Sequence, residues 1–152
     1  IRFFKELTQG DYASLFDHPY LAVFQRLHRQ FGLKVQLNLF YKTDGFDLSE
    51  MTDRYKAEWT ENAHWLKLSF HSEWENVEPY KNSPYDEVFA HCSAVHREIL
   101  RFAGKETLSA CTTIHWGEGN ISCFRLKSMT QALAIAMDYE NVTKVEVKAD
   151  DE

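Results

Sequence analysis

The sequence predicts an α/β fold in which parallel β/α units form an irregular or partial (β/α) barrel. The first observation is that helix-like and strand-like segments alternate along the chain, an order that forces parallel pairing with helical crossovers. The second is the length: 152 residues suit one domain but fall short of the roughly 250 of a complete eightfold barrel. The third is that polar, chemistry-bearing residues follow the strand-like segments, as they do at the mouth of such a fold.

The first half of the chain supplies two helix and strand pairs. A helix is predicted between Asp17, a suitable N-cap, and Gly32, a suitable stop, because apolar residues recur there at helical spacing. Residues 34–41 then alternate between polar and apolar side chains, which predicts a strand. A second helix over residues 48–59 and a second strand over residues 65–70 follow.

The second half continues the alternation. A long helix is predicted over residues 85–102, and a third strand over residues 108–114. Residues 126–139 predict a further helix, and residues 142–148 a short edge strand. The chain opens on an amphipathic stretch with no cap before it, so residues 1–152 are expected to form a single β/α domain that could lack an N-terminal strand.

Composition and charge narrow the functional classes. The chain is 44% hydrophobic, and it contains no apolar run near the ~20 residues of a membrane span. Its net charge of −6, without clustered Lys and Arg, argues against a nucleic-acid partner and favours a neutral or sugar-like substrate. Its three cysteines are odd in number and form no close pair, which predicts reduced thiols and a cytoplasmic location.

The candidate site is a pair of histidines. His71 and His115 each follow the last apolar residue of a predicted strand, and one helix separates these strands. Because carboxyl ends of parallel strands open into one crevice, both imidazoles are expected to face it. Neutral imidazole is a common zinc ligand, and a carboxylate such as that of Glu75 can complete the set. The alternative is that each histidine only hydrogen-bonds at a loop mouth.

Aromatic residues surround the same strand ends. Tyr41, Trp74, Tyr80 and Trp116 all lie at predicted strand ends or in adjoining loops. Aromatic faces at such places stack on sugar rings, or they shield the mouth of the barrel, and the sequence leaves both interpretations open.

The stretch His71-Ser72-Glu73-Trp74-Glu75 resembles the His-Ser/Thr-x-x-His signature of the polysaccharide deacetylase (NodB-homology) family. In that family two histidines of this motif hold a divalent metal, and Glu75 stands here in place of the second. The order of elements is also similar over roughly residues 1–125. At the place of the family's Arg-x-Pro-Tyr motif the chain has His115 and Trp116, so the arginine is missing.

The resemblance implies a metal-dependent deacetylase that acts on an N-acetyl group of a carbohydrate or amino sugar. His71 and Glu75 would be ligands of a divalent metal, zinc above all, and His115 a third ligand or the catalytic acid. Asp17, in a stretch similar to a degraded Thr-Phe-Asp-Asp-Gly motif, would be the base if it were not a helix cap. Two alternatives remain: a catalytically inactive carbohydrate-binding relative, and an unrelated α/β barrel enzyme.

Overall fold

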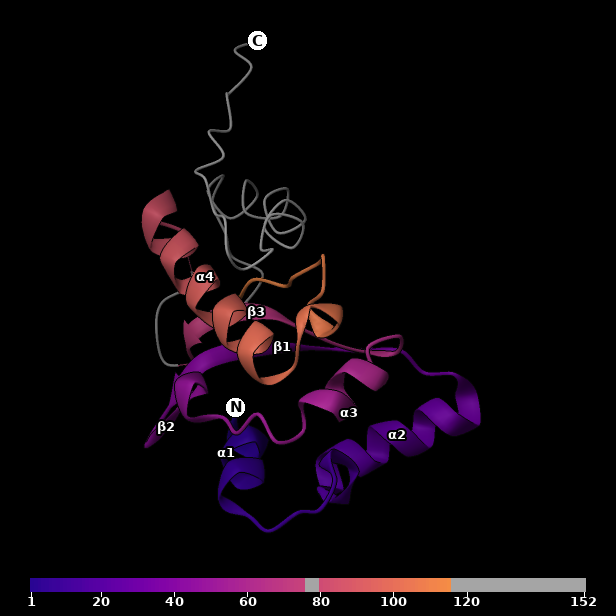
Figure 1. The fold of residues 1–152 in the computed structure, drawn as a ribbon. Helices are drawn as coiled ribbons and strands as arrows, with labels where there is room; N and C mark the ends of the chain where they lie inside the picture. The colour runs from indigo at the N-terminus through magenta and orange to yellow at the C-terminus, as the bar shows by residue number, and fades with distance from the viewer. Residues whose placement is uncertain (76–79, 116–152) are drawn as a thin grey trace.

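The structure, a computed structural model, describes residues 1–75 and 80–115 (Figure 1). These residues form helices, short 3-10 helices and strands that alternate along much of the chain. In order they are α1 (Arg2–Gln9), η1 (Leu15–Asp17), α2 (Pro19–Phe31), β1 (Val35–Thr43), β2 (Phe46–Asp47), η2 (Leu48–Glu50), α3 (Lys56–Glu61), β3 (Leu66–Trp74), α4 (Tyr85–Phe102) and η3 (Lys105–Thr107).

The sheet of the described residues has the order β2-β1-β3. β1 and β3 are parallel, with Val35 opposite Leu66, and α3 lies in the crossover between them. β2 turns back antiparallel to β1 and pairs only at its end, through the tight turn at Gly45. The α/β class and the parallel pairing of the first two predicted strands are therefore confirmed, in a small mixed sheet.

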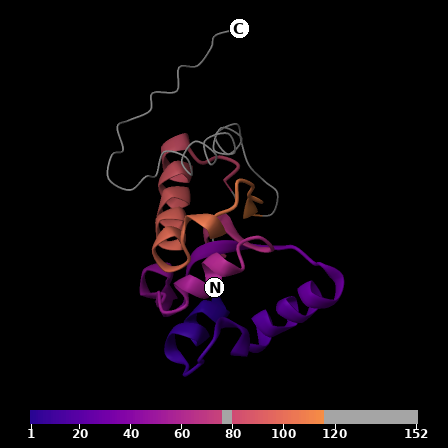
Figure 2. The same cartoon turned by 45° about the vertical axis from the view of Figure 1, so that its right-hand side comes forward.

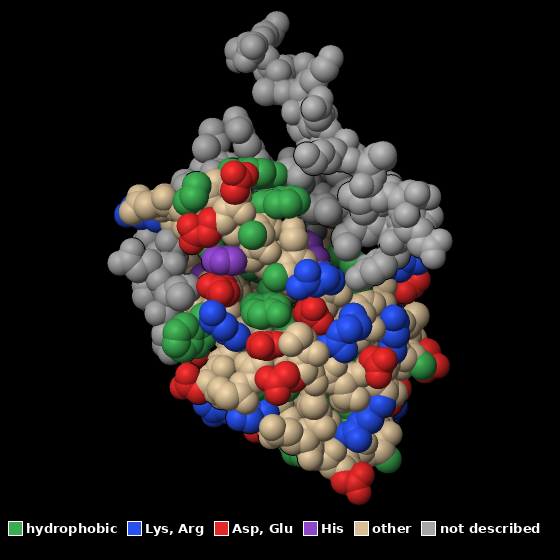
Figure 3. Space-filling model, turned by 60° about the vertical axis from the view of Figure 1, so that its left-hand side comes forward, with side chains coloured by type: hydrophobic (Ala, Val, Ile, Leu, Met, Phe, Trp, Pro, Cys, Tyr) green, Lys and Arg blue, Asp and Glu red, His purple; other side chains and the backbone are tan. Residues whose placement is uncertain are grey.

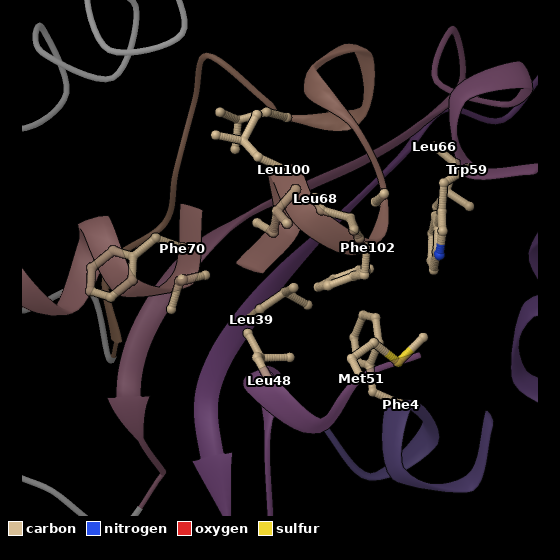
Figure 4. Close-up of a cluster of buried hydrophobic side chains, with 14 of the residues drawn as sticks. Phe4, Leu39, Leu48, Met51, Trp59, Leu66, Leu68, Phe70, Leu100 and Phe102 are labelled. Atoms are coloured by element: carbon tan, nitrogen blue, oxygen red, sulfur yellow. The ribbon is translucent and has the colours of Figure 1, made fainter. Parts of the chain in front are cut away.

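One face of the sheet carries the hydrophobic core. α4 packs across β3 and β1, and Figure 2 shows it standing over the strands. Alternate residues of β3 point toward this layer and are fully buried, because successive side chains of a strand leave opposite faces. The cluster continues down to α1 and α3 (Figure 4), and its members include Phe4, Leu39, Leu48, Met51, Trp59, Leu66, Leu68, Phe70, Leu100 and Phe102.

The predicted third strand is wrong. Residues 108–114 run beside β3, but the only ladder pairing there is one isolated parallel bridge between Leu108 and Leu68. Side chains of β3 make most of the remaining contacts to this segment, so its backbone does not enter a continuous ladder. The described residues thus form an open sheet and show no closed barrel.

The helix predicted over residues 48–59 is divided into η2 and α3. Asp47 and Glu50 form a capping box around η2, and Met51 then takes an extended backbone that ends the turn. α3 begins only at Lys56. The apolar spacing remains helical across the break because the two short helices bury the same side of the chain.

Asp17 does not cap α2, contrary to the prediction. Pro19 occupies the first helical position, so the N-cap is His18, whose Nδ1 accepts from the Tyr20 amide at 3.2 Å. Asp17 instead accepts from the Ser14 amide at 2.9 Å and completes a capping box around η1. The predicted stop is confirmed at Gly32, which takes a left-handed conformation with φ of 68°.

The predicted helix over residues 126–139 and the predicted strand over residues 142–148 lie outside the described residues. Within the described part of the chain, none of the helices combines the length and the apolar character required to cross a bilayer.

Candidate functional site

His71 occupies an irregularity inside β3. The strand runs on to Trp74, so His71 does not lie beyond its end as the sequence suggested. Leu39 of β1 pairs with Phe70, but the next residue, Phe40, pairs with Ser72. His71 is therefore the extra residue of a β-bulge, a feature that redirects a side chain and is frequent beside functional sites.

The two predicted histidines lie side by side. His71 Nε2 and His115 Nδ1 are 3.2 Å apart, and the rings meet edge to face with centroids separated by 5.0 Å. Their other nitrogens point to backbone carbonyls: His71 Nδ1 lies 2.5 Å from Thr113 O, and His115 Nε2 lies 3.2 Å from Glu75 O. The structure thus brings the ends of two chain segments together through a pair of imidazoles.

The hydrogen positions of this pair depend on the tautomer of each ring. A carbonyl oxygen only accepts, so a ring nitrogen that bonds one carries a proton. When both outer nitrogens donate, the neutral rings have lone pairs on their inner nitrogens, 3.2 Å apart, and these nitrogens can share a proton or a metal ion. When His115 is protonated on Nδ1 instead, it donates an N–H···N hydrogen bond to His71 Nε2.

The surroundings of His71 favour its neutral form. His115 is only 4% exposed, and the ring of Phe40 lies nearly perpendicular to both imidazoles, with centroid distances of 5.0 Å to His71 and 5.2 Å to His115. Burial lowers the pKa of His71, against the opposing effect of its hydrogen bond to Thr113. Because metals bind imidazole in its neutral form, these surroundings suit a ligand better than a permanently charged side chain.

The segment that carries His115 is held by side chains of β3. Lys67, Ser69 and His71 alternate along the strand, so all three leave the face opposite the core. Lys67 donates to Glu106 O, Ser69 Oγ donates to Cys111 O at 2.7 Å, and His71 bonds Thr113 O. Burying such polar side chains without partners would cost free energy. Here their hydrogen bonds fix residues 106–115, and with them His115.

A second polar cluster lies on the side of the sheet that α4 covers. Glu73 Oε1 accepts from Lys42 Nζ at 2.8 Å, and Glu73 Oε2 lies 3.5 Å from His91 Nε2. The hydroxyl of Tyr80 accepts from the Glu73 amide at 3.0 Å and lies 3.0 Å from His91 Nδ1. We call these four residues the Glu73 cluster.

Sequence reasoning missed this cluster. His91 lies within a helical pattern, where a single histidine carries no signal of function. Lys42 and Glu73 are adjacent only through the pairing of β1 with β3. Spacing alone would mislead here, because Glu73 follows His71 by two residues and would share its face in a regular strand, whereas the register shift places it on the α4 side. Figure 3 shows histidine, acidic, basic and hydrophobic side chains close together on one face of the molecule, with charges of both signs interspersed.

The other predicted metal and catalytic residues are placed differently. Glu75 contacts His115 through its backbone carbonyl, and its side chain is exposed. Asp17 lies beyond the amino end of β3, since its neighbour Phe16 stacks on Trp65 with a centroid distance of 6.0 Å. His71 lies toward the other end of the same strand, and the part of Asp17 as the base stays a prediction. Within residues 1–75 and 80–115, no three His, Cys, Asp or Glu side chains are grouped to hold a metal.

The predicted sugar-binding aromatics also separate. Tyr41 and Trp74 are partly exposed near the carboxyl ends of β1 and β3, and Lys42 Nζ lies 5.8 Å from the centre of a Trp74 ring. Tyr80 is only 2% exposed, so its ring offers no open face, and its predicted part in sugar binding stays a prediction. Trp116 lies outside the described residues.

Comparison of the chain with known protein families, with curated proteins and with solved structures finds no match. The functional conclusion therefore rests on the side chains themselves. The histidine pair is the most specific arrangement that we find among the described residues, because ring nitrogens from two chain segments lie 3.2 Å apart.

Proposed function

We propose that this domain is a metal-dependent hydrolase that removes an N-acetyl or related acyl group from a carbohydrate, built on a partial (β/α) barrel. The observation that carries the proposal is the 3.2 Å separation of His71 Nε2 and His115 Nδ1. Two nitrogens that bind one tetrahedral zinc at about 2.0–2.1 Å are separated by about 3.3–3.4 Å. The inner nitrogens therefore already have nearly the spacing of two zinc ligands.

The outer nitrogens support the same proposal. Histidines that bind a metal almost always donate their other N–H to a carboxylate, a backbone carbonyl or water, which fixes the tautomer. Both rings here meet that requirement through backbone carbonyls, those of Thr113 and Glu75. In this proposal the backbone carbonyls keep the inner nitrogens unprotonated and available to the ion.

A divalent ion at this point would polarise an acyl carbonyl and lower the pKa of water. The chain's own residues would bind the ion and orient the substrate. His71 and His115 hold the ion, Phe40 excludes water from one side of both rings, and Trp74 and Tyr41 offer partly exposed faces to a sugar ring. Glu75, whose exposed side chain directly follows β3, is the proposed carboxylate ligand. Asp17 has no part in this proposal.

A second function has one observation in its favour. No three metal-binding side chains are grouped among the described residues, and Glu75 contributes a carbonyl rather than a carboxylate to the pair. A carbohydrate-binding module without a metal would need only the aromatic faces. In that case the histidine pair would share a proton.

Elemental analysis and a deacetylation assay with N-acetylglucosamine oligomers test the proposal. We expect the purified protein to retain zinc, cobalt or nickel, and we expect His71→Ala to lose both metal and turnover. His64→Ala is the matched control, because His64 is exposed and its Nδ1 bonds the nearby Glu61 carbonyl, outside the histidine pair. A wild-type protein that takes up none of these metals at saturating concentration would eliminate the hydrolase and leave the binding module.

A further inference from the structure

The Glu73 cluster forms a closed ring of polar contacts. The amide of Glu73 donates to the Tyr80 hydroxyl, the hydroxyl lies 3.0 Å from His91 Nδ1, and His91 Nε2 lies 3.5 Å from the Glu73 carboxylate. Lys42 holds the other carboxylate oxygen from the neighbouring strand. The ring thus begins and ends on one residue, and it ties β3 to β1, to α4 and to the loop that contains Tyr80.

The hydroxyl of Tyr80 takes part in two of these contacts. It accepts from the Glu73 amide, so its own proton is available to His91 Nδ1. The other ring nitrogen of His91, Nε2, lies 3.5 Å from the Glu73 carboxylate. Burial raises the pKa of Tyr80, so its hydroxyl keeps the proton that it offers to His91.

The position of Glu73 explains how this ring of contacts affects the histidine pair. Glu73 lies two residues after His71 and two residues before Glu75, whose carbonyl fixes His115. A bulge leaves the local ladder incomplete, so the backbone around His71 needs another restraint. The ring supplies it from α4, an 18-residue helix whose inner face is buried in the core.

We infer that Tyr80 and His91 are positioning residues, which clamp the end of β3 through Glu73 and thereby hold His71 and the Glu75 carbonyl at the spacing that a metal ion requires. The inference rests on the proposed function for its metal. The clamp itself restrains the positions of the two histidine rings whether or not an ion is bound. Tyr80 and His91 act through the backbone of β3, because Tyr80 accepts from the Glu73 amide and His91 lies beside the Glu73 carboxylate.

Tyr80→Phe tests the clamp with little loss of packing, because the ring that contacts Phe70 is kept and only the hydroxyl is removed. We expect cobalt or zinc affinity, measured by competition with a chelator, to fall by about 10–100-fold. We also expect the ring ¹⁵N signals of His71 and His115 in the metal-free protein to shift. Tyr20→Phe is the matched control: Tyr20 is 45% exposed on α2, and neither readout should change.

A second pair of variants separates positioning from stability. His91 is partly exposed, with a side-chain exposure of 25%, so its replacement leaves the fold intact even if Tyr80→Phe does not fold. We expect His91→Ala to lower the metal affinity and to shift the ring ¹⁵N signals of His71 and His115. His91→Gln keeps an acceptor for Tyr80 and a donor for Glu73, so we expect it to restore most of the metal affinity and most of the original ring signals.

The two proposals fail in different ways. A wild-type protein that binds no metal would overturn the hydrolase, while the ring ¹⁵N signals would still decide whether the clamp holds the histidine pair. Unchanged ring signals in both Tyr80→Phe and His91→Ala would overturn the clamp. Metal affinity that matches Tyr20→Phe in both variants would overturn it equally.

Discussion

Ser69→Ala should loosen the segment that carries His115. Ser69 is fully buried, and its hydroxyl donates to Cys111 O at 2.7 Å. The substitution removes one hydrogen bond and leaves a carbonyl without that donor, a change that costs about 1–3 kcal/mol. Urea denaturation measures the loss in the free energy of unfolding. The matched control is Ser49→Ala, an exposed site whose hydroxyl bonds Asp47, where the cost should stay within about 0.5 kcal/mol.

A double-mutant cycle makes the test stricter. Thr112 donates to Phe70 O and so ties the same segment to β3. If the two hydroxyls hold one segment, Ser69→Ala and Thr112→Val should be coupled by about 0.5–3 kcal/mol. The ring signals of His115 should move in each single variant. Equal costs for Ser69→Ala and Ser49→Ala, with His115 signals unchanged, would refute the idea that side chains hold this segment.

His18→Ala should destabilise the protein by about 1–2 kcal/mol in urea denaturation, because the buried imidazole caps α2 and pairs with Glu6 at 2.7 Å; a loss below about 0.3 kcal/mol would contradict this. His96 predicts a pH dependence, since burial lowers its pKa to about 4. The unfolded chain binds the proton more tightly, so stability should fall as the pH drops from about 7 to about 4, by up to about 3 kcal/mol. His96→Leu should remove that part of the pH dependence, and an unchanged profile would count against it.

The elements with strong apolar periodicity could be predicted from the sequence. Residues 34–41 and 85–102 have the periods of a strand and a helix, and they form β1 and α4 with small changes of boundary. The parallel pairing of β1 with β3 followed from the helix between them. These features depend on side chains that are buried along one face, which a sequence displays directly.

The elements held by polar side chains could not be predicted. The polar run after Phe70 indicated the end of a strand, yet β3 continues through it. The strand continues because polar side chains before and within this run, those of Ser69, His71 and Glu73, bond to other segments. Residues 108–114 have strand-like composition, but these side chains replace most of a backbone ladder. Such partners are distant in sequence, and no local pattern identifies them.

The candidate site could be predicted only in part, because some of its contacts also join segments that are distant in sequence. The approach of His71 and His115 follows from topology. The segment that carries His115 runs parallel beside β3, which carries His71, so both histidines reach the same end of the sheet. The bulge that turns His71 toward His115 depends on a register shift that the sequence does not reveal. The Glu73 cluster depends on the packing of α4 over the sheet, which periodicity predicts only as a contact between layers.

The most direct test of the account is long-range ¹H–¹⁵N NMR of the imidazole rings with and without zinc. We expect zinc to change the signals of His71 Nε2 and His115 Nδ1, the inner nitrogens, while His71 Nδ1 and His115 Nε2 stay protonated against their carbonyls. Inner nitrogen signals that do not respond to saturating zinc, or outer nitrogens that lose their protons instead, would contradict the claim that this pair is built to share a metal ion.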